Sequence, residues 1–168
     1  MSESWPGDVA AAMRGFRRRW ATGVAVVTLV TERGALRGIT VTALMPVSLE
    51  PPVLSLALTA DGEFATHVEP GVRVGVSILD ARQEFWSDRF AGRAPVPDDG
   101  FTGMGYRRMA GVPVLEGSLA GCTGRVRRVE AVGDHQLVLV DVDEVDPGHD
   151  TDDPLLTYEG RYRHLEAE

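Results

Sequence analysis

One stretch of the sequence constrains the fold more than any other: GITVTALMPVSLEPPVLSLAL, at residues 38–58. Its first part alternates hydroxyl and apolar side chains, and its last part, residues 53–58, is apolar except for Ser55. Prolines separate the two parts. The stretch therefore predicts two β-strands joined by a proline-marked corner at residues 45–52.

The first of these strands carries a face of small and hydroxyl-bearing side chains. Thr40 and Thr42 alternate with Val41 and so share one face, while Gly38 permits a close approach of another chain segment. Such a face suits a flat, phosphate-bearing ligand. The alternative is a barrel strand in which the threonines simply satisfy β-propensity.

Composition narrows the classes of function. The 168 residues are 43% hydrophobic and carry a net charge of -8, and all 17 basic residues are arginines. An acidic chain is a poor nucleic-acid surface, and a chain without lysine cannot form a Schiff base. The single Cys122 cannot form an intramolecular disulfide, which predicts a reducing, cytoplasmic location. No apolar run is long enough to span a membrane and no set of metal ligands is evident, so we expect a soluble protein without a metal site.

Periodicity predicts a mainly β chain of one domain, residues 1–168, with residues 1–12 as a peripheral tip. Strands are expected at 24–31, 37–43, 53–58, 72–79, 119–130 and 135–144, and helices at 9–20, from Asp61, and at 81–91. The arginines that end the first helix are interpreted as a solvated helix end. Because closure removes exposed strand edges, a closed antiparallel barrel is the economical architecture.

Two helices and one loop carry further expectations. The helix from Asp61 follows a strand directly and is a weak candidate for binding phosphate. The helix at 81–91 is expected to direct Phe85, Trp86 and Phe90 inward, with Gln83, Glu84 and Asp88 outward. The Gly- and Pro-rich loop at 93–105 is long enough to serve as a lid or an interface segment.

Few residues point to chemistry by themselves. His135 begins a strand just after Gly133 and Asp134, and a tail cluster of Tyr158, Arg161 and Tyr162 could stack on a ring system or cover a barrel end. No Ser/His/Asp order, phosphate-binding loop, HExxH or CxxC motif occurs. The residues alone therefore indicate a β-barrel that could hold one small ligand.

The sequence also resembles the short-chain flavin reductase family. The resemblance rests on several short segments in order: FRRRWATGVAVVT at 16–28, GITVTAL at 38–44, VSLEPPVLSLAL at 47–58, DRFAG at 88–92, GDH at 133–135 and PLLTYEGRYRHL at 154–165. It implies an antiparallel split β-barrel of the Greek-key, FMN-binding type with a few short peripheral helices. It also implies a homodimer, FMN or FAD bound near the subunit interface, NADH or NADPH as hydride donor, and a partner monooxygenase that receives reduced flavin.

The resemblance implies site residues as well. The strand at 40–43 would contact the flavin ring and ribityl chain, its backbone N–H groups facing the pyrimidine edge, and residues 57–62 would line the ribityl and phosphate side. The cofactor-binding set is Thr40, Val41, Thr42, Ala43, Ala57, Leu58, Thr59, Gly62, Phe64, Arg89, Phe90, Tyr158 and Arg161. His135 is the catalytic candidate, near the nicotinamide, for hydride transfer from nicotinamide C4 to flavin N5. The loop at 93–105 and residues 158–162 would complete the neighbouring subunit's pocket.

The chain also departs from the family pattern. Many relatives have two adjacent serines where this chain has Thr42 and Ala43, Asn or Asp at Thr59, and serine near Gly62. Fewer hydroxyls predict looser flavin binding, or FAD in place of FMN. Two alternatives stay open: a flavin-dependent enzyme acting on another substrate in the same barrel, and a non-catalytic flavin-binding module.

Overall fold

The computed structural model describes residues 7–94, 100–148 and 153–165. Parts of two expectations, the N-terminal tip at 1–6 and the loop at 95–99, lie outside the described residues. In chain order the elements are α1 (Gly7–Arg18), β1 (Thr22–Gly23), β2 (Ala25–Val30), β3 (Leu36–Val41), β4 (Leu44–Leu49), β5 (Pro52–Thr59), η1 (Phe64–His67), β6 (Arg73–Ile78), η2 (Ala81–Gln83), α2 (Glu84–Phe90), β7 (Tyr106–Met109), β8 (Val112–Leu115), β9 (Ala120–Val132), β10 (His135–Asp146), β11 (Leu156–Tyr158) and β12 (Arg161–Arg163).

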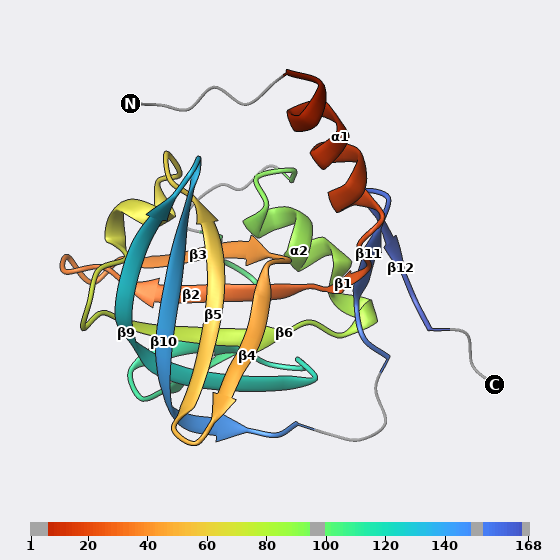
Figure 1. Ribbon diagram of the computed structural model, residues 1–168. Helices are drawn as coiled ribbons and strands as arrows, with labels where there is room; N and C mark the ends of the chain where they lie inside the picture. The colour runs from red at the N-terminus through yellow and green to blue at the C-terminus, as the bar shows by residue number, and fades with distance from the viewer. Residues whose placement is uncertain (1–6, 95–99, 149–152, 166–168) are drawn as a thin grey trace.

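Seven strands form one antiparallel sheet in the order β3-β2-β6-β9-β10-β5-β4 (Figure 1). The sheet curls so that β9, β10, β5 and β4 cross over β3, β2 and β6, but its two edge strands, β3 and β4, are not paired with each other. The expected mainly β, antiparallel architecture is confirmed. The expectation of a closed barrel is wrong, because the sheet stays open between β3 and β4, as in a split barrel.

Two apolar cores hold the fold together. The first lies inside the curled sheet and includes Val27, Leu56, Val76 and Val138, each at most 2% exposed. The second lies on the other side of β2 and packs Val26, Leu79, Phe90, Phe101 and Leu155 beneath α2 and β8. Alternate side chains of β2 enter the two cores, which is why this strand is buried on both faces.

Gly38 of β3 is needed for the second core. A Cβ atom added there would lie 2.5 Å from Cε1 of Phe90, so only glycine allows the ring to pack flat on the strand. Phe90 in turn meets Phe101 edge to face, with ring centroids 5.0 Å apart. The close approach that the sequence predicted at Gly38 is thus made by α2.

The structure corrects the expected proline-marked corner at residues 45–52. Residues 44–49 form strand β4, and the chain turns only at Glu50 and Pro51. Proline fits β4 because this strand lies at the edge of the sheet, where a missing backbone N–H removes no ladder hydrogen bond. Pro52 then begins β5, which pairs with β4.

The helices also differ from the expectation. The helix expected from Asp61 is the short 3-10 turn η1, and Glu63 at its start makes no side-chain cap. The helix at 81–91 begins as the 3-10 turn η2 with a capping box, in which Asp80 and Gln83 bond each other's backbone N–H. This box buries Gln83, which was expected outward, and the change of helix type leaves Phe85 58% exposed instead of inward.

Candidate functional site

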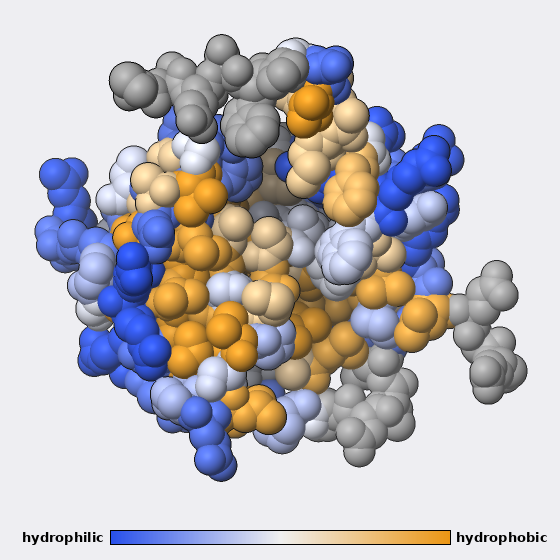
Figure 2. Space-filling view, viewed as in Figure 1, coloured by the Kyte–Doolittle hydropathy of each residue, from blue (hydrophilic) through white to orange (hydrophobic). Residues whose placement is uncertain are grey.

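A cavity of about 740 Å³ lies where the sheet stays open. Its walls come from the end of α1, from β1, from β3 and the link to β4, and from β5, β10 and β11. They are formed by residues 17, 18, 20, 22, 39–45, 55–59, 135, 137 and 157–160. Figure 2 shows apolar side chains gathered over the face that carries β5 and β10, beside a hollow. The volume is typical of a site for a small ligand or cofactor.

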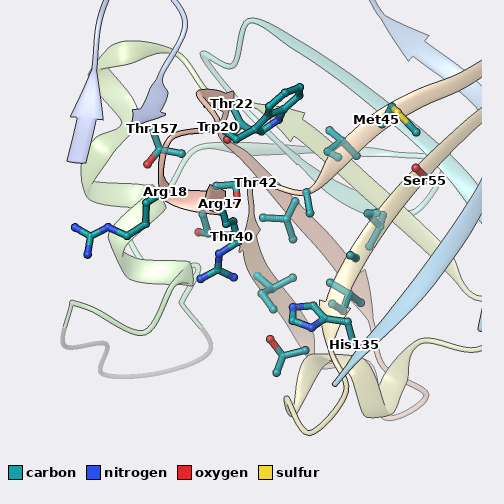
Figure 3. A pocket seen from close by; sticks show the side chains of 18 of the residues that line it. Arg17, Arg18, Trp20, Thr22, Thr40, Thr42, Met45, Ser55, His135 and Thr157 are labelled. Atoms are coloured by element: carbon teal, nitrogen blue, oxygen red, sulfur yellow. The ribbon is translucent and has the colours of Figure 1, made fainter. Parts of the chain in front are cut away.

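Several hydroxyl-bearing residues line this cavity. Thr40, Thr42, Ser55 and Thr157 border it on different sides (Figure 3). Thr59 borders it as well. The Thr40 hydroxyl donates to the main-chain oxygen of Ser87 at 2.7 Å. Thr42 has no hydrogen-bond partner among the described residues, so its hydroxyl is available to a ligand.

Thr22 adds an unsatisfied group. Its Oγ1 is buried and has no hydrogen-bond partner in the described part of the chain. A buried hydroxyl without a partner costs free energy unless a ligand or water supplies one. The free edge of β3 supplies further polar groups, because alternate backbone N–H and C=O groups of an edge strand point away from its single partner.

His135 borders the cavity, and its neighbour Asp134 lies exposed outside the cavity lining. The Nδ1–H of His135 donates to the Asp134 carboxylate, 2.7 Å away, and His135 lies opposite Thr59 of β5. The bond to His135 is the main cause that lowers the pKa of Asp134 below its usual range, and the charge of Arg17 acts in the same direction. The cavity therefore presents an imidazole that is oriented by an ionised carboxylate outside the cavity lining.

The hairpin β11-β12 closes the side of the cavity opposite β5. The backbone of Glu159 and Arg18 form a bond at 2.7 Å, and the Arg18 side chain donates to the Glu159 carbonyl at 3.0 Å. The Tyr162 hydroxyl lies 2.8 Å from Ser87 Oγ and 2.7 Å from an oxygen of Asp88, which ties the hairpin to α2. These bonds bring Tyr158 to the cavity.

A family model described as a flavin reductase like domain matches residues 17–166. The chain belongs to the flavin reductase-like family. An NADH-dependent flavin reductase of Rhodococcus sp is 35% identical over 88% of this chain and 82% of its own. A flavin reductase (NADPH) of Lentzea aerocolonigenes is 38% identical over 88% and 85%. The solved styrene monooxygenase flavin reductase of Pseudomonas putida S12 is 31% identical, covers 92% of this chain and 97% of its own, and has a TM-score of 0.80.

The cavity of this flavin reductase-like chain fits the cofactor of its family. Apolar walls suit a flat ring system, the unpartnered hydroxyls of Thr22 and Thr42 suit a polyhydroxyl chain, and arginines at the rim suit a phosphate. Among the described residues, no group of three or more His, Cys, Asp or Glu side chains could hold a metal ion. Nor does any helix in the described ranges have the length and apolar character to cross a membrane.

Nine of the residues predicted for the site border the cavity: Thr40, Val41, Thr42, Ala43, Ala57, Leu58, Thr59, His135 and Tyr158. The other five do not border it: Gly62, Phe64, Arg89, Phe90 and Arg161. Phe64 is buried in the first core and Phe90 in the second.

The other three residues that do not border the cavity, Gly62, Arg89 and Arg161, have other surroundings. Gly62 closes a turn, with its N–H bonded to the Thr59 carbonyl at 3.2 Å. Arg89 is buried, donates to the Thr102 carbonyl at 2.7 Å and lies over the Trp86 ring. Arg161 is exposed on β12, although its neighbour Gly160 reaches the cavity.

Tyr158 lines the cavity of its own chain. That residues 158–162 also complete the pocket of a neighbouring subunit stays a prediction. The described part of the loop at 93–105 also packs within its own chain, with Phe101 and Met104 buried in the second core.

Sequence reasoning missed the end of α1. Arg17, Arg18 and Trp20 all border the cavity, although the arginines were interpreted as a solvated helix end. The available signal was their position, since only Ala21 separates FRRRW from the strand segment TGV. Thr22, in that same segment, was missed as well.

Proposed function

We propose that the chain is an NAD(P)H-dependent flavin reductase that transfers hydride to FMN or FAD and supplies reduced flavin to a partner monooxygenase. The observation that carries the proposal is the cavity in the split of the barrel, with apolar walls and unpartnered hydroxyls, in a chain of the flavin reductase-like family. The similarity to NADH- and NADPH-dependent reductases and to the reductase of styrene monooxygenase supports the donor and the partner.

The protein's own contribution is to hold and orient the reactants. A bound flavin would accept the hydride at its ring system. The free edge of β3 and the link at 42–43 can donate backbone hydrogen bonds to the edge of the ring that gains charge, while Ile39, Leu56 and Leu58 give it an apolar bed. The cavity is open at its rim, which favours exchange of flavin with the solution over permanent retention.

His135 acts as a positioning residue in this proposal. Its bond to Asp134 fixes the plane of the imidazole at the end of the cavity where a second nucleotide can enter. Hydride transfer itself needs no proton from this ring. An oriented imidazole can instead hydrogen-bond the hydride donor and set its distance from the flavin.

We propose further that the chain works as a homodimer. Edge strand β4 exposes three large apolar side chains, Met45 at 57%, Val47 at 51% and Leu49 at 84%. An apolar groove of about 390 Å³ runs beside it. An exposed apolar edge strand is prone to pair or to be covered, so a second copy is its natural partner.

Helix α1 supports the same assembly. Val9, Met13, Phe16 and the following Trp20 fall on one face at helical spacing, each is 49% to 68% exposed, and α1 buries no residue in its own chain. In an isologous dimer this apolar stripe could cover the β4 face of the other copy.

With one cysteine and no disulfide, we place the enzyme in the cytoplasm.

Assembly is tested by light scattering on Leu49→Asp and on the control Val132→Asp, which changes an equally apolar, 53% exposed side chain at the β9-β10 turn. The Leu49 variant should be monomeric and the Val132 variant dimeric. A monomeric wild-type chain would contradict the proposed dimer. It would not bear on the proposed reductase activity, which is tested separately.

The activity is tested by aerobic oxidation of NADH and of NADPH with FMN, FAD or riboflavin added to the flavin-free protein. Oxidation should depend on flavin and saturate with it. Tight flavin retention through gel filtration with poor turnover of free flavin would instead indicate a flavoenzyme with another substrate. Flavin binding without any oxidation would indicate a non-catalytic module, and neither binding nor oxidation would reject a flavin site altogether.

A further inference from the structure

The side chain of Arg17 is directed into the cavity from the last turn of α1. Figure 3 shows its guanidinium between Thr40 and His135, while the neighbouring Arg18 points away along the hairpin β11-β12. Arg18 is engaged, because it donates to the Glu159 carbonyl. The Arg17 side chain forms no hydrogen bond or ion pair with any described residue.

The backbone fixes where Arg17 points. The two bonds between Arg18 and Glu159, at 2.7 Å and 3.0 Å, join residues 141 positions apart and clamp the end of α1 against the turn of the hairpin. Since adjacent residues on a helix point about 100° apart, this clamp directs Arg17 over the mouth of the cavity. The fold therefore sets the direction in which the Arg17 side chain leaves the helix.

The charges around the cavity leave Arg17 without a partner of opposite sign. The charge of Arg17 helps to lower the pKa of Asp134, but Asp134 is bonded to His135 and makes no ion pair with Arg17. Glu159 borders the cavity through the hairpin turn, where its main chain is tied to Arg18. In a chain of net charge -8, an unpaired cation held over a cavity is suited to bind an anion.

A simpler account would treat Arg17 as one more cation at a helix C-terminus, where it offsets the helix dipole. Arg19 has the same position relative to the dipole, being exposed just beyond the helix end, but it does not border the cavity. The dipole therefore explains a cluster of arginines at this end of α1. It does not explain why one of them is directed into the site.

We propose that Arg17 binds a phosphate group of the nucleotides that occupy this cavity, and so helps to determine which nucleotide is used. The inference rests on the proposed flavin reductase function. A guanidinium matches a phosphate by two parallel N–H donors, whereas the cavity walls below it are apolar and hydroxyl-bearing. The phosphate could belong to the flavin nucleotide or to the nicotinamide dinucleotide, and the two sources are separable by experiment.

The test compares Arg17→Gln with wild type, with Arg19→Gln as the matched control that removes the same charge from the same helix end. Dissociation constants for riboflavin, FMN and FAD are measured by flavin fluorescence quenching, and KM for NADH and NADPH at saturating flavin. We expect a loss of about 10-fold in Arg17→Gln for at least one phosphate-bearing ligand, and none for riboflavin, which has no phosphate. Arg19→Gln should stay close to wild type for all of them.

The pattern of loss identifies the source. Weaker binding of FMN with unchanged binding of riboflavin would assign Arg17 to the flavin phosphate. A higher KM for both NADH and NADPH would assign it to the diphosphate of the nicotinamide dinucleotide. A higher KM for NADPH alone would assign it to the 2′-phosphate. Arg17→Lys should keep part of the affinity, because it retains the charge but not the paired donors. The loss should also shrink as salt is raised, since the site is at the rim.

Three results would overturn the proposal: unchanged constants for every ligand in Arg17→Gln, an equal loss of riboflavin, or the same loss in Arg19→Gln. The melting temperature should stay unchanged, because the Arg17 side chain is exposed and bonds no described residue of its own chain. A wild-type protein that binds neither riboflavin nor FMN would reject the proposed function itself, and this inference with it. Wild-type binding with unchanged variant constants would reject Arg17 alone.

Discussion

The Thr40 hydroxyl donates a hydrogen bond of 2.7 Å to the main-chain oxygen of Ser87 and so ties β3 to α2. Thr42, two residues further along, has no such partner and borders the cavity. Two hydroxyls that are equivalent in the sequence therefore have different tasks. One stabilises the wall of the site, and the other faces the ligand.

Thr40→Val should accordingly lower stability more than it lowers flavin affinity. The lost bond is worth about 0.5 to 1.5 kcal/mol, and the penalty stays in this range because the Ser87 oxygen keeps its bond from the Ala91 N–H. For a chain of this size the melting temperature should fall by about 1 to 6 °C. Thr40→Ser keeps the hydroxyl and serves as the control. A melting temperature unchanged in the valine variant would contradict the role assigned to this bond.

Thr42→Val should lower flavin affinity more than it lowers stability. If its hydroxyl bonds the flavin, the loss is again about 0.5 to 1.5 kcal/mol, which weakens binding by roughly 2- to 12-fold while the melting temperature stays constant. Ala43→Ser, next to it on the same wall, should add a donor and tighten binding by a similar factor. Fluorescence quenching measures both changes. Equal flavin affinity in wild type and Thr42→Val would mean that this hydroxyl faces the cavity without contacting the ring or its chain.

The sequence predicts the strands well because their signal is local. Alternation and β-branched runs locate β2, β5 and β10 to within a residue or two at most of their ends. The prediction fails at β4, where Pro46 in the sequence indicates a corner. In the folded sheet β4 is an edge strand, and an edge strand tolerates proline. The prediction also fails at Gln83, because a capping box with Asp80 overrides the helical face that hydropathy predicts.

The site is predicted only in part, for a similar reason. The family resemblance points to residues 40–43 and 57–59. They border the cavity because β3 and β5, which do not pair with each other, come together where the sheet stays open, and the Ala57 N–H donates to the Ala43 carbonyl at 3.0 Å. Arg17 was missed because its direction depends on the contact of Arg18 with Glu159, 141 positions away. No periodicity near Arg17 contains that information.

His135→Ala should raise KM for the nicotinamide nucleotide or lower kcat, since the imidazole held by Asp134 orients the hydride donor. Asp134→Asn should produce a smaller change of the same kind, because an amide can still bond the ring but does not supply the charge. His67→Ala is the matched control, as His67 lies in η1 and does not border this cavity. Steady-state kinetics at saturating flavin provide the measurement, and kinetics unchanged in His135→Ala would exclude the positioning role.

Stability should fall at acid pH in part through Asp80. Its carboxylate is 3% exposed and bonded to Arg82, and that bond is the main cause that lowers the pKa of Asp80. A lowered pKa in the folded state contributes stability above the unfolded value of about 3.9, and this contribution is lost as pH falls through the folded value. Wild type should therefore exceed Asp80→Asn in unfolding free energy near neutral pH, and the difference should shrink below about pH 4. A difference independent of pH in urea titrations would show that the charge of Asp80 is not what stabilises the turn.

Cys122 offers a prediction on a single thiol in the apolar groove beside β4. Burial is the main cause that raises the pKa of this thiol to about 11, and the charge of Asp143 adds to it. Only the thiolate is alkylated, so at pH 8 the folded protein should react with iodoacetamide about 100-fold more slowly than the urea-unfolded chain, whose thiol pKa is about 8.5. Between pH 8 and pH 9 the folded rate should rise about 10-fold and the unfolded rate only about 3-fold. Mass spectrometry reads out this one site. A dimer that covers the groove would slow alkylation of the folded protein further but would leave the tenfold pH dependence intact. If alkylation of the folded protein showed the shallow pH dependence of the unfolded chain, the thiol would not be desolvated.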